Sequence, residues 1–399
     1  MRFLFMHEFF PGQYRHVAAA LARDPRHAVA FATRDHTGSL PGVTKLIYKP
    51  QRAPHPETHH YLAPAEAAVL SGQAAARACL ALKARGFVPD VICAHAGFGP
   101  ALFIKEIFPD ARLVGYFEWF YRARGSDADY LDPNAVDGEE ACRIRMRNAS
   151  VLLELAQADV AVCPTAFQRD QFPPPFRDKL VQLHDGIDTA FFSPAAAGEA
   201  PPVAGLPADA EVITYATRGM EPYRGFPQFL EAAAAVLERR PKAHVVIAGS
   251  DTVHYSRTLP AGETYKSRGL ELLAGIDRSR LHFIGTLSLA RYRALLRRSN
   301  VHVYLTVPFV LSWSLLEAMA CGCLVVAADT APVREVVTDG SNGLLVDFRD
   351  PAALAELISQ ALDRPGRGRD LRDAARRRIE EGYALSRTLP QHFRLLGVQ

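Results

Sequence analysis

Two arginines six residues apart are the first candidates for chemistry in this chain. Arg218 ends the β-rich run EVITYATRG, and Arg224 precedes a glycine where a helix is predicted to start. Guanidinium groups form forked, charge-assisted hydrogen bonds, and the N–H groups at a helix start add to the attraction for an anion. The pair is therefore suited to binding a diphosphate. Spacing alone also allows the alternative of two exposed arginines on a polar turn.

Glu317 is a second candidate, within the run FVLSWSLLEAMACG at residues 309–322. Ser314 and Glu317 have the spacing of a capping box, in which the serine caps the helix and the glutamate bonds back to the N–H of the cap. The same helix follows a predicted parallel strand, so its start should face a ligand, and a carboxylate there can accept two ribose hydroxyl groups. Position alone leaves capping and ligand binding equally open.

Three further candidates follow predicted strands in the first half of the chain. Gly12 opens a helix after the first strand, where a glycine lets the backbone approach a diphosphate closely, although ordinary turn chemistry explains it equally well. His95 and Glu118 end later strands, and either could orient or deprotonate an acceptor hydroxyl group. A structural hydrogen bond is the alternative for each. The aromatic residues 119–121 could form a wall for sugar stacking beside Glu118.

A metal site is not expected. Histidines 55, 59 and 60 share a loop, but they have no carboxylate or cysteine partner at a recognisable spacing. No Asp-x-Asp element stands at a predicted strand end. We therefore predict neither a metal nor a resident cofactor.

The elements that position these residues alternate between short β-rich runs and helical stretches, a pattern that predicts parallel sheets covered on both faces. Residues 193–210 are rich in Pro, Ala and Gly without periodicity and predict a hinge. The expected fold is α/β, with two doubly wound Rossmann-like domains facing each other across a cleft. They span residues 1–194 and 205–383, and the tail, about 384–399, is expected to pack back on the first domain.

Length and composition agree with two cores. The chain has 399 residues, of which 49% are hydrophobic and 22% charged. A chain of this length is too long for one ordinary domain. A formal charge of +3 with scattered arginines argues against a nucleic-acid binder. Six cysteines occur without a CxxC pair, which fits a reducing cytoplasm.

The sequence predicts no membrane-spanning helix. His7 and Glu8 interrupt the first apolar run, which we interpret as a strand and not as a signal peptide. No window approaches the roughly 20 apolar residues that cross a bilayer. A cytoplasmic protein is expected, with peripheral contact to the inner membrane face as an option. Arginines 143, 145 and 147 could touch anionic lipid there, or form a solvated helix face.

Several motifs resemble the retaining glycosyltransferases of family 4, which have the GT-B fold. The run SLLEAMACGCLVVAAD, followed by REVVTDGSNGLLVDFRDPAALA, is similar to the family signature. TRGMEPYRG resembles its Arg…Lys-Gly phosphate site, with Arg224 replacing the lysine, and HDGID at 184–188 resembles its Asn-Gly-Val-Asp turn. Together these motifs cover most of residues 184–365. The turn at Gly12 is similar to the family's glycine-rich loop, His95 stands at a common family position, and Glu118 stands where many relatives place a histidine that contacts the acceptor.

The resemblance implies that Glu317, as the later glutamate of a Glu-x7-Glu pair, binds the nucleotide ribose. The earlier glutamate of the pair, which lies beside the donor sugar in relatives, is replaced by Phe309. We expect a variant donor pocket lined by Phe309 and Trp313. Backbone N–H groups at the helix start should cradle the sugar or phosphate; the residues concerned are Ser312, Trp313, Ser314 and Leu315.

The function implied by the resemblance is transfer of a hexosyl group from a nucleotide-diphosphate sugar to a hydroxyl acceptor, with retention of configuration. The acceptor would be a glycan, a lipid-linked glycan or a small molecule, in cell-envelope polysaccharide or lipopolysaccharide synthesis. Two alternatives remain: another GT-B enzyme, such as a nucleotide-sugar epimerase or a phosphorylase, and a non-catalytic sugar-nucleotide-binding protein. A dinucleotide oxidoreductase is disfavoured, because no G-x-G-x-x-G follows a strand.

Overall fold

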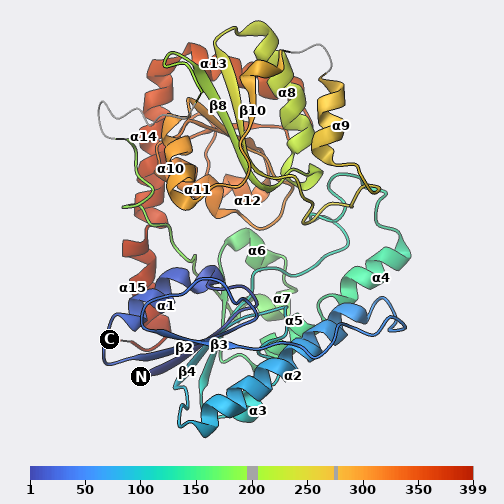
Figure 1. The fold of residues 1–399 in the computed structure, drawn as a ribbon, viewed down its shortest axis with the longest axis vertical. Helices are drawn as coiled ribbons and strands as arrows, with labels where there is room; N and C mark the ends of the chain where they lie inside the picture. The colour runs from blue at the N-terminus through green and yellow to red at the C-terminus, as the bar shows by residue number, and fades with distance from the viewer. Residues whose placement is uncertain (196–204, 274–276, 399) are drawn as a thin grey trace. The chain divides into compact units, whose positions relative to one another are not determined.

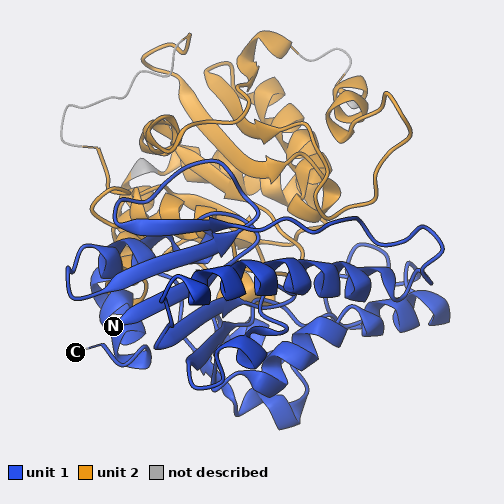
Figure 2. Cartoon of the chain, turned by 60° about the horizontal axis from the view of Figure 1, so that its bottom comes forward, with its two compact units in different colours: residues 1–186, 385–399 blue, residues 187–384 orange. Residues whose placement is uncertain are grey.

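The computed structural model describes residues 1–195, 205–273 and 277–398. Figure 1 follows the chain, and Figure 2 shows its two compact units, unit 1 (Met1–Gly186 with Leu385–Gln399) and unit 2 (Ile187–Ala384). The division falls at Gly186 and Ile187, before the expected hinge at 193–210. The N–H of Ile187 donates to the carbonyl of Tyr383 at 2.8 Å, and Phe192 lies in a hydrophobic cluster of unit 2. The segment before the hinge therefore packs with unit 2, and residues 196–204 of the hinge lie outside the described part.

Unit 1 contains a seven-stranded parallel sheet in the order β3-β2-β1-β4-β5-β6-β7. Alternate residues of β1 face different clusters: Leu4 packs with α2 and α3, and Phe5 packs with α1 and α15. The continuous apolar run in β1 follows from this burial on both faces. The strands are β1 (Arg2–Met6), β2 (Ala28–Thr33), β3 (Val43–Ile47), β4 (Val91–His95), β5 (Arg112–Tyr116), β6 (Val160–Cys163) and β7 (Leu180–Gln182). The helices are α1 (Arg15–Ala22), α2 (Ala63–Ala84), α3 (Ile104–Ile107), α4 (Gly138–Met146), α5 (Ala149–Gln157), α6 (Ala166–Asp170), α7 (Pro174–Arg177) and α15 (Leu385–Leu395).

Unit 2 contains a six-stranded parallel sheet in the order β10-β9-β8-β11-β12-β13. Its strands are β8 (Glu211–Gly219), β9 (Ala243–Ser250), β10 (Leu281–Phe283), β11 (Val301–Tyr304), β12 (Val325–Ala328) and β13 (Leu344–Val346). Its helices are α8 (Phe226–Arg239), α9 (Tyr265–Leu272), α10 (Leu289–Arg298), α11 (Trp313–Ala320), α12 (Ala331–Arg334), α13 (Pro351–Asp363) and α14 (Pro365–Gly382).

Each sheet has a point where its strand order reverses. In unit 1, β1 lies between β2 and β4, and in unit 2, β8 lies between β9 and β11. Open α/β sheets bind ligands beside such points, outside the carboxyl ends of the strands. The residues that follow β1 and β4 in unit 1, and β8 and β11 in unit 2, therefore lie at the edges where a ligand is expected.

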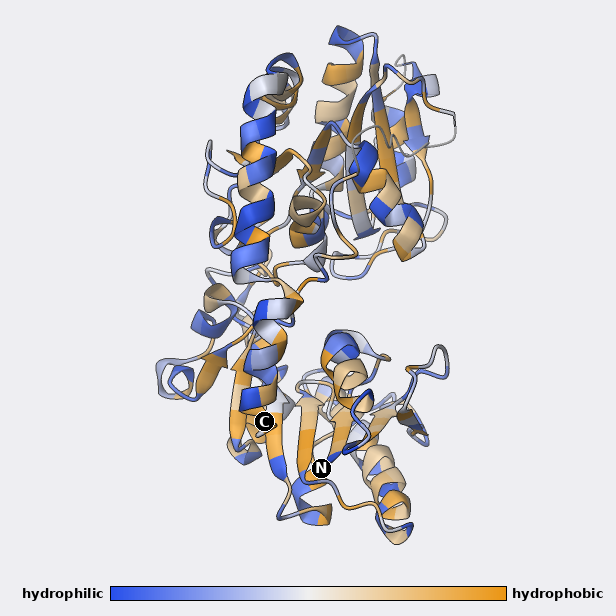
Figure 3. Cartoon of the chain, turned by 90° about the vertical axis from the view of Figure 1, so that its left-hand side faces the viewer, coloured by the Kyte–Doolittle hydropathy of each residue, from blue (hydrophilic) through white to orange (hydrophobic). Residues whose placement is uncertain are grey.

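Helix α14 is amphipathic. It presents mostly hydrophilic residues along its length in Figure 3, while Leu371, Ala375 and Ile379 are buried at helical spacing. Arg376 donates to the carbonyl groups of Phe192 and Ala320, both at 2.6 Å. The mixed charges of 366–383 thus form the exposed face of a helix whose other face closes the core.

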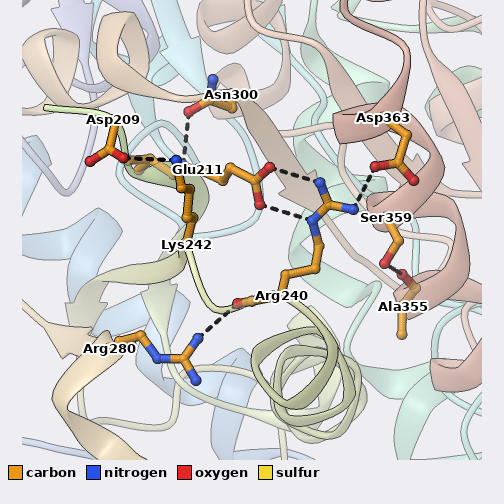
Figure 4. Close-up of polar contacts among 10 residues, drawn as sticks. Asp209, Glu211, Arg240, Lys242, Arg280, Asn300, Ala355, Ser359 and Asp363 are labelled. Carbon is orange, nitrogen blue, oxygen red and sulfur yellow. Dashed lines mark hydrogen bonds and ion pairs between the residues drawn. The ribbon is translucent and has the colours of Figure 1, made fainter. Parts of the chain in front are cut away.

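A charged network closes the amino-terminal side of the unit 2 sheet (Figure 4). The guanidinium of Arg240, after α8, bonds both carboxylate oxygens of Glu211 at 2.7 and 2.8 Å and reaches Asp363 at 2.7 Å. Arg280 donates to the carbonyl oxygen of Arg240 at 2.9 Å. Glu211 is the first residue of β8, so these contacts tie α8 and α13 to the sheet at the edge opposite the expected ligand site.

Candidate functional site

A cavity of about 390 Å³ lies at the carboxyl edge of the unit 2 sheet. It brings together four residues predicted from the sequence, which are Arg218, Ser312, Ser314 and Glu317. A second cavity of about 40 Å³ shares the first three and adds Arg224. The two arginines and the ribose-binding candidate therefore belong to adjoining cavities at the predicted edge.

Arg218 lies within an irregular part of β8. The pairing of β8 with β9 shifts register between Ala216 and Gly219, and bulges of this kind redirect side chains beside functional sites. The Ser250 hydroxyl donates to the carbonyl of Arg218 at 2.5 Å, which fixes the backbone. Its side chain is exposed, and among the described residues no carboxylate pairs with it. This guanidinium is thus available to an anionic ligand.

Arg224 is half-buried beside an aromatic ring. Its Nη1 donates to the hydroxyl of Thr306 at 3.1 Å, and its guanidinium carbon lies 5.2 Å from the ring centre of Tyr255. The following Gly225 has φ of +66°, and a Cβ there would lie 2.5 Å from the Cβ of Leu305. The glycine after Arg224 therefore has a steric explanation, because a larger residue would not let α8 begin so close to the end of β11.

Helix α11 begins earlier than the predicted capping box requires. Its N-cap is Ser312, whose hydroxyl accepts from the N–H of Ser314 at 3.3 Å. The capping-box prediction is therefore wrong, because Ser314 already lies in the first turn. Glu317 is half-buried and lines the larger cavity near Tyr292. Burial raises the pKa of the Tyr292 hydroxyl, and the charge of Glu317 raises it further.

The predicted backbone cradle at the start of α11 is already engaged within unit 2. The N–H of Ser312 donates to the Tyr304 hydroxyl at 3.1 Å, and that of Leu315 donates to the carbonyl of Ser312 at 3.3 Å. Leu315 itself is fully buried in the core. Ser312 and Ser314 line both cavities, and their hydroxyl oxygens lie 3.0 Å apart.

Phe309 and Trp313 line neither of these two cavities. Phe309 is 9% exposed and packs edge-on against Tyr223 and Tyr255, with ring centres 5.5 and 5.2 Å away. Trp313 packs against a hydrophobic cluster of the core. The residue in place of the family's earlier glutamate thus builds an aromatic cluster beside Arg224.

Glu221 and His254 were not singled out from the sequence. Glu221 is fully buried, and its Oε2 accepts the N–H groups of His254, Tyr255 and Ser256 at 3.2, 2.9 and 2.7 Å. His254 lines the larger cavity. Burial lowers the pKa of His254, and the guanidinium of Arg218 lowers it further. The only signal in the sequence is the position of Glu221 between the two arginines.

In unit 1, His95 and Glu118 meet at the ends of β4 and β5. Their Nε2 and Oε2 atoms are 3.6 Å apart, and Gln13 donates to the other oxygen of Glu118 at 2.8 Å. His95 is buried, and its Nδ1 lies 2.9 Å from the carbonyl of Ala96. When Nδ1 donates to that carbonyl, Nε2 is the ring nitrogen that faces Glu118. The pair can therefore hold or receive a hydroxyl proton.

His7, at the end of β1, completes this cluster and was also missed. Its ring centre is 4.6 Å from that of His95, and burial lowers its pKa well below the usual value, with the nearby His95 as a second cause. Gly12 has φ of +51°, and a Cβ on it would lie 2.9 Å from the His7 ring. The glycine after β1 is thus required by the close approach of its turn to His7.

The predicted aromatic wall at residues 119–121 is largely packed inside unit 1. Trp119 is buried, and Tyr121 lies under the guanidinium of Arg147, 3.7 Å from its ring centre. The exposed rings beside the histidines are Phe9, 50% exposed, and Phe98, 39% exposed. Phe98 contacts both His7 and His95. The aromatic surface of this edge therefore comes from other residues than those predicted.

Residues 1–195, 205–273 and 277–398 contain no cluster of three potential metal ligands. None of the helices in these ranges combines the length and apolarity that a bilayer crossing requires. In the arginine cluster, Arg143 pairs with Glu140 at 2.5 Å, and Arg147 stacks on Tyr121.

Solved structures share this fold. Sucrose-phosphate synthase from Thermosynechococcus elongatus superposes with a TM-score of 0.76 over 99% of this chain and 98% of that chain, at 18% identity. Anabaena HepE in complex with UDP-glucose gives a TM-score of 0.70 over 100% and 99% of the two chains, at 17% identity. The GT-B fold that the motifs implied is confirmed.

Curated relatives share part of their length with this chain. A D-inositol 3-phosphate glycosyltransferase of Corynebacterium efficiens is 28% identical over 54% of the chain and 49% of the relative. One from Mycolicibacterium smegmatis is 33% identical over 47% and 41%. The chain thus matches about half the length of these relatives or less.

The family model described as "Glycosyl transferase family 4 group" matches residues 25–192, and that described as "Glycosyl transferases group 1" matches residues 199–378. The chain belongs to the family 4, group 1, glycosyltransferases.

Proposed function

We propose that the protein transfers a sugar from a nucleotide-diphosphate sugar to a hydroxyl acceptor with retention of configuration. The observation that carries this proposal is the cavity of unit 2, where an unpaired guanidinium, Arg218, lines the same space as Glu317. An anion site and a carboxylate in one cavity suit a ligand with a diphosphate and a ribose.

Arg218 and Arg224 hold the diphosphate in this proposal, and Glu317 accepts hydroxyl groups of the ribose. Ser312 and Ser314 offer hydroxyl groups to the sugar or the phosphate. Phe309 and Trp313 contribute to the pocket indirectly in this proposal. Phe309 packs against Tyr223, and Trp313 packs against the hydrophobic core. Gly12 remains a proposed site of close backbone approach.

The proposed reaction is a same-face displacement. The bond between the anomeric carbon and the diphosphate oxygen breaks, and its electron pair leaves with the diphosphate. The acceptor oxygen bonds to the same face of that carbon, and its proton passes to the departing phosphate oxygen. Arg218 and Arg224 stabilise the charge that develops on the diphosphate. His95 and Glu118 orient the acceptor hydroxyl group.

The known ligands and names of similar proteins are compatible with these substrates. HepE has been solved in complex with UDP-glucose, and the curated relatives are named D-inositol 3-phosphate glycosyltransferases. The hexosyl type, the retention of configuration, the cytoplasmic location with peripheral membrane contact and the role in cell-envelope glycan synthesis rest on the family resemblance.

The proposal is tested first by ligand-induced thermal stabilisation. Ligands that bind the native state raise its apparent stability by mass action. We expect one class of nucleotide-sugar to raise the melting temperature of the wild type and of Arg240→Ala, a matched arginine variant at the opposite edge of unit 2. Arg218→Ala should lose the shift. Equal shifts in all three proteins, or none in the wild type, would contradict the proposed donor site.

Donor turnover then separates the alternatives. A glycosyltransferase releases nucleoside diphosphate much faster when a hydroxyl acceptor is present. An epimerase converts the donor without an acceptor. A non-catalytic binding protein leaves the donor intact, and this alternative is retained because Phe309 replaces the family glutamate.

A further inference from the structure

The contact between Glu221 and the loop 250–256 links the ends of two strands. Glu221 follows β8 between the two arginines, and its single oxygen Oε2 accepts three successive backbone N–H groups of the loop that follows β9. A fully buried carboxylate is stable only when hydrogen bonds replace its hydration. The loop that it holds is itself largely exposed, with His254 and Tyr255 both exposed. A buried carboxyl group thus anchors a surface loop beside the cavity.

The same loop lies close to the backbone next to Arg218. A Cβ on Gly219 would lie 2.4 Å from the carbonyl oxygen of Thr252 and 2.7 Å from Cδ2 of His254, so glycine makes room for the imidazole. Nε2 of His254 lies 3.1 Å from the Thr252 hydroxyl, and that hydroxyl lies 2.5 Å from that of Ser250. These contacts place the His254 ring over the residue after Arg218, in the cavity that both side chains line.

Tyr255 extends the arrangement toward Arg224. Its ring stacks on Tyr223 with centres 5.5 Å apart, and the Arg224 guanidinium lies 5.2 Å from its centre. The N–H of Tyr223 also donates to the hydroxyl of Ser256 at 3.0 Å. One carboxylate therefore fixes a loop that contacts the surroundings of both arginines.

We propose that His254 is a further contact to the diphosphate of the donor, and that Glu221 is a positioning residue that holds His254 beside Arg218. This inference rests on the proposed donor site. A ring N–H of His254 donates to a phosphate oxygen that Arg218 also contacts. Loss of the Glu221 carboxylate releases the loop, so substitution of either Glu221 or His254 removes the same interaction with the ligand.

A double-mutant cycle on ligand affinity tests this coupling, with UDP, GDP and UDP-glucose as probes in titration calorimetry on the full chain. His254→Ala should weaken binding about five- to tenfold, as expected for one lost hydrogen bond, with an unchanged melting temperature. Glu221→Ala should weaken binding at least as much and also lower the melting temperature. The double variant should bind no more weakly than Glu221→Ala, because the two changes share one contact.

Two controls separate positioning from general stability. Glu221→Gln retains one carbonyl oxygen that can accept the loop N–H groups, so it should recover part of the affinity. Asp350→Ala removes the N-cap of α13, where the carboxylate accepts the N–H of Ala353 at 2.8 Å, and should lower the melting temperature without changing the affinity.

The outcomes are distinct. Additive losses in the double variant, or full affinity in His254→Ala, would overturn the inference even when Arg218→Ala abolishes binding as proposed. A wild type that binds none of the probes overturns the donor site and this inference together.

Discussion

The two cavities of unit 2 are lined by Arg218, Arg224 and the carboxylate of Glu317, whereas the corresponding edge of unit 1 carries Glu118 beside the imidazoles of His7 and His95. Both edges lie where the strand order of a parallel sheet reverses. The same architecture therefore carries the proposed anion site in one unit and the proposed hydroxyl-orienting site in the other. The difference comes from the few residues that follow the strands, as expected when function resides in sites carried by a common fold.

The largest expected effect is on the anion side of this comparison. Arg218→Ala should reduce turnover by about 10²- to 10³-fold, the usual loss when a donor to developing negative charge is removed. Arg218→Lys keeps the charge without the forked geometry and should recover only part of the rate. Steady-state kinetics with a saturating acceptor measure both. Turnover of Arg218→Ala within twofold of the wild type would remove the distinction between the two edges.

A second substitution acts on unit 1. Glu118→Gln removes the negative charge near Nε2 of His95 and should lower transfer about 10²-fold, within the usual range for positioned acids and bases. Donor affinity, measured by calorimetry, should stay unchanged. A large loss of donor affinity would instead assign Glu118 to the donor, and the comparison between the units would have to be redrawn.

Glu317→Gln sharpens the assignments within the unit 2 cavity. Hydrogen bonds to a charged group contribute about 1.5–3 kcal/mol, so the affinity for a nucleoside diphosphate should fall at least tenfold. Inorganic pyrophosphate has no ribose, and its affinity should remain that of the wild type. Equal losses for the two ligands would show that Glu317 acts on the anion site as a whole.

The smallest effect concerns a buried histidine in the interior of the unit 2 sheet. His302 lies inside β11, with Nδ1 2.8 Å from the Thr214 hydroxyl, and burial lowers its pKa from 6.5 to about 4. Below pH 6.5 the unfolded chain binds a proton that the native state excludes, so stability falls as the pH falls. Between pH 7.5 and 5.5 this histidine should contribute a loss of about 1 kcal/mol in the free energy of unfolding.

Chemical denaturation across that pH range measures this contribution. His302→Gln should show a shallower loss of stability on acidification than the wild type, whereas a variant of the exposed His36, His36→Gln, should not differ from it. Parallel pH profiles for the wild type and His302→Gln would show that this histidine does not titrate as proposed.

Much of the site was predictable because strand ends carry their residues to a known edge. The positions of Arg218 after a strand and of Glu317 near a helix start made them candidates, the family resemblance favoured ligand binding, and both line the cavity. The start of α11 was misplaced by two residues, because two serines compete for the cap and local spacing does not distinguish them. Phe309 was expected to line the pocket, but its surroundings depend on two tyrosines far away in the sequence.

The order of apolar runs and turns in the sequence by itself determined two parallel α/β sheets and the edge at which polar residues gather, because alternation and strand polarity are local properties. Only the tertiary structure decided that Glu221 anchors a loop more than thirty residues away and that His7 lies against His95. Such contacts depend on which strands become neighbours and how closely their turns approach, and side-chain packing across the sheet sets both.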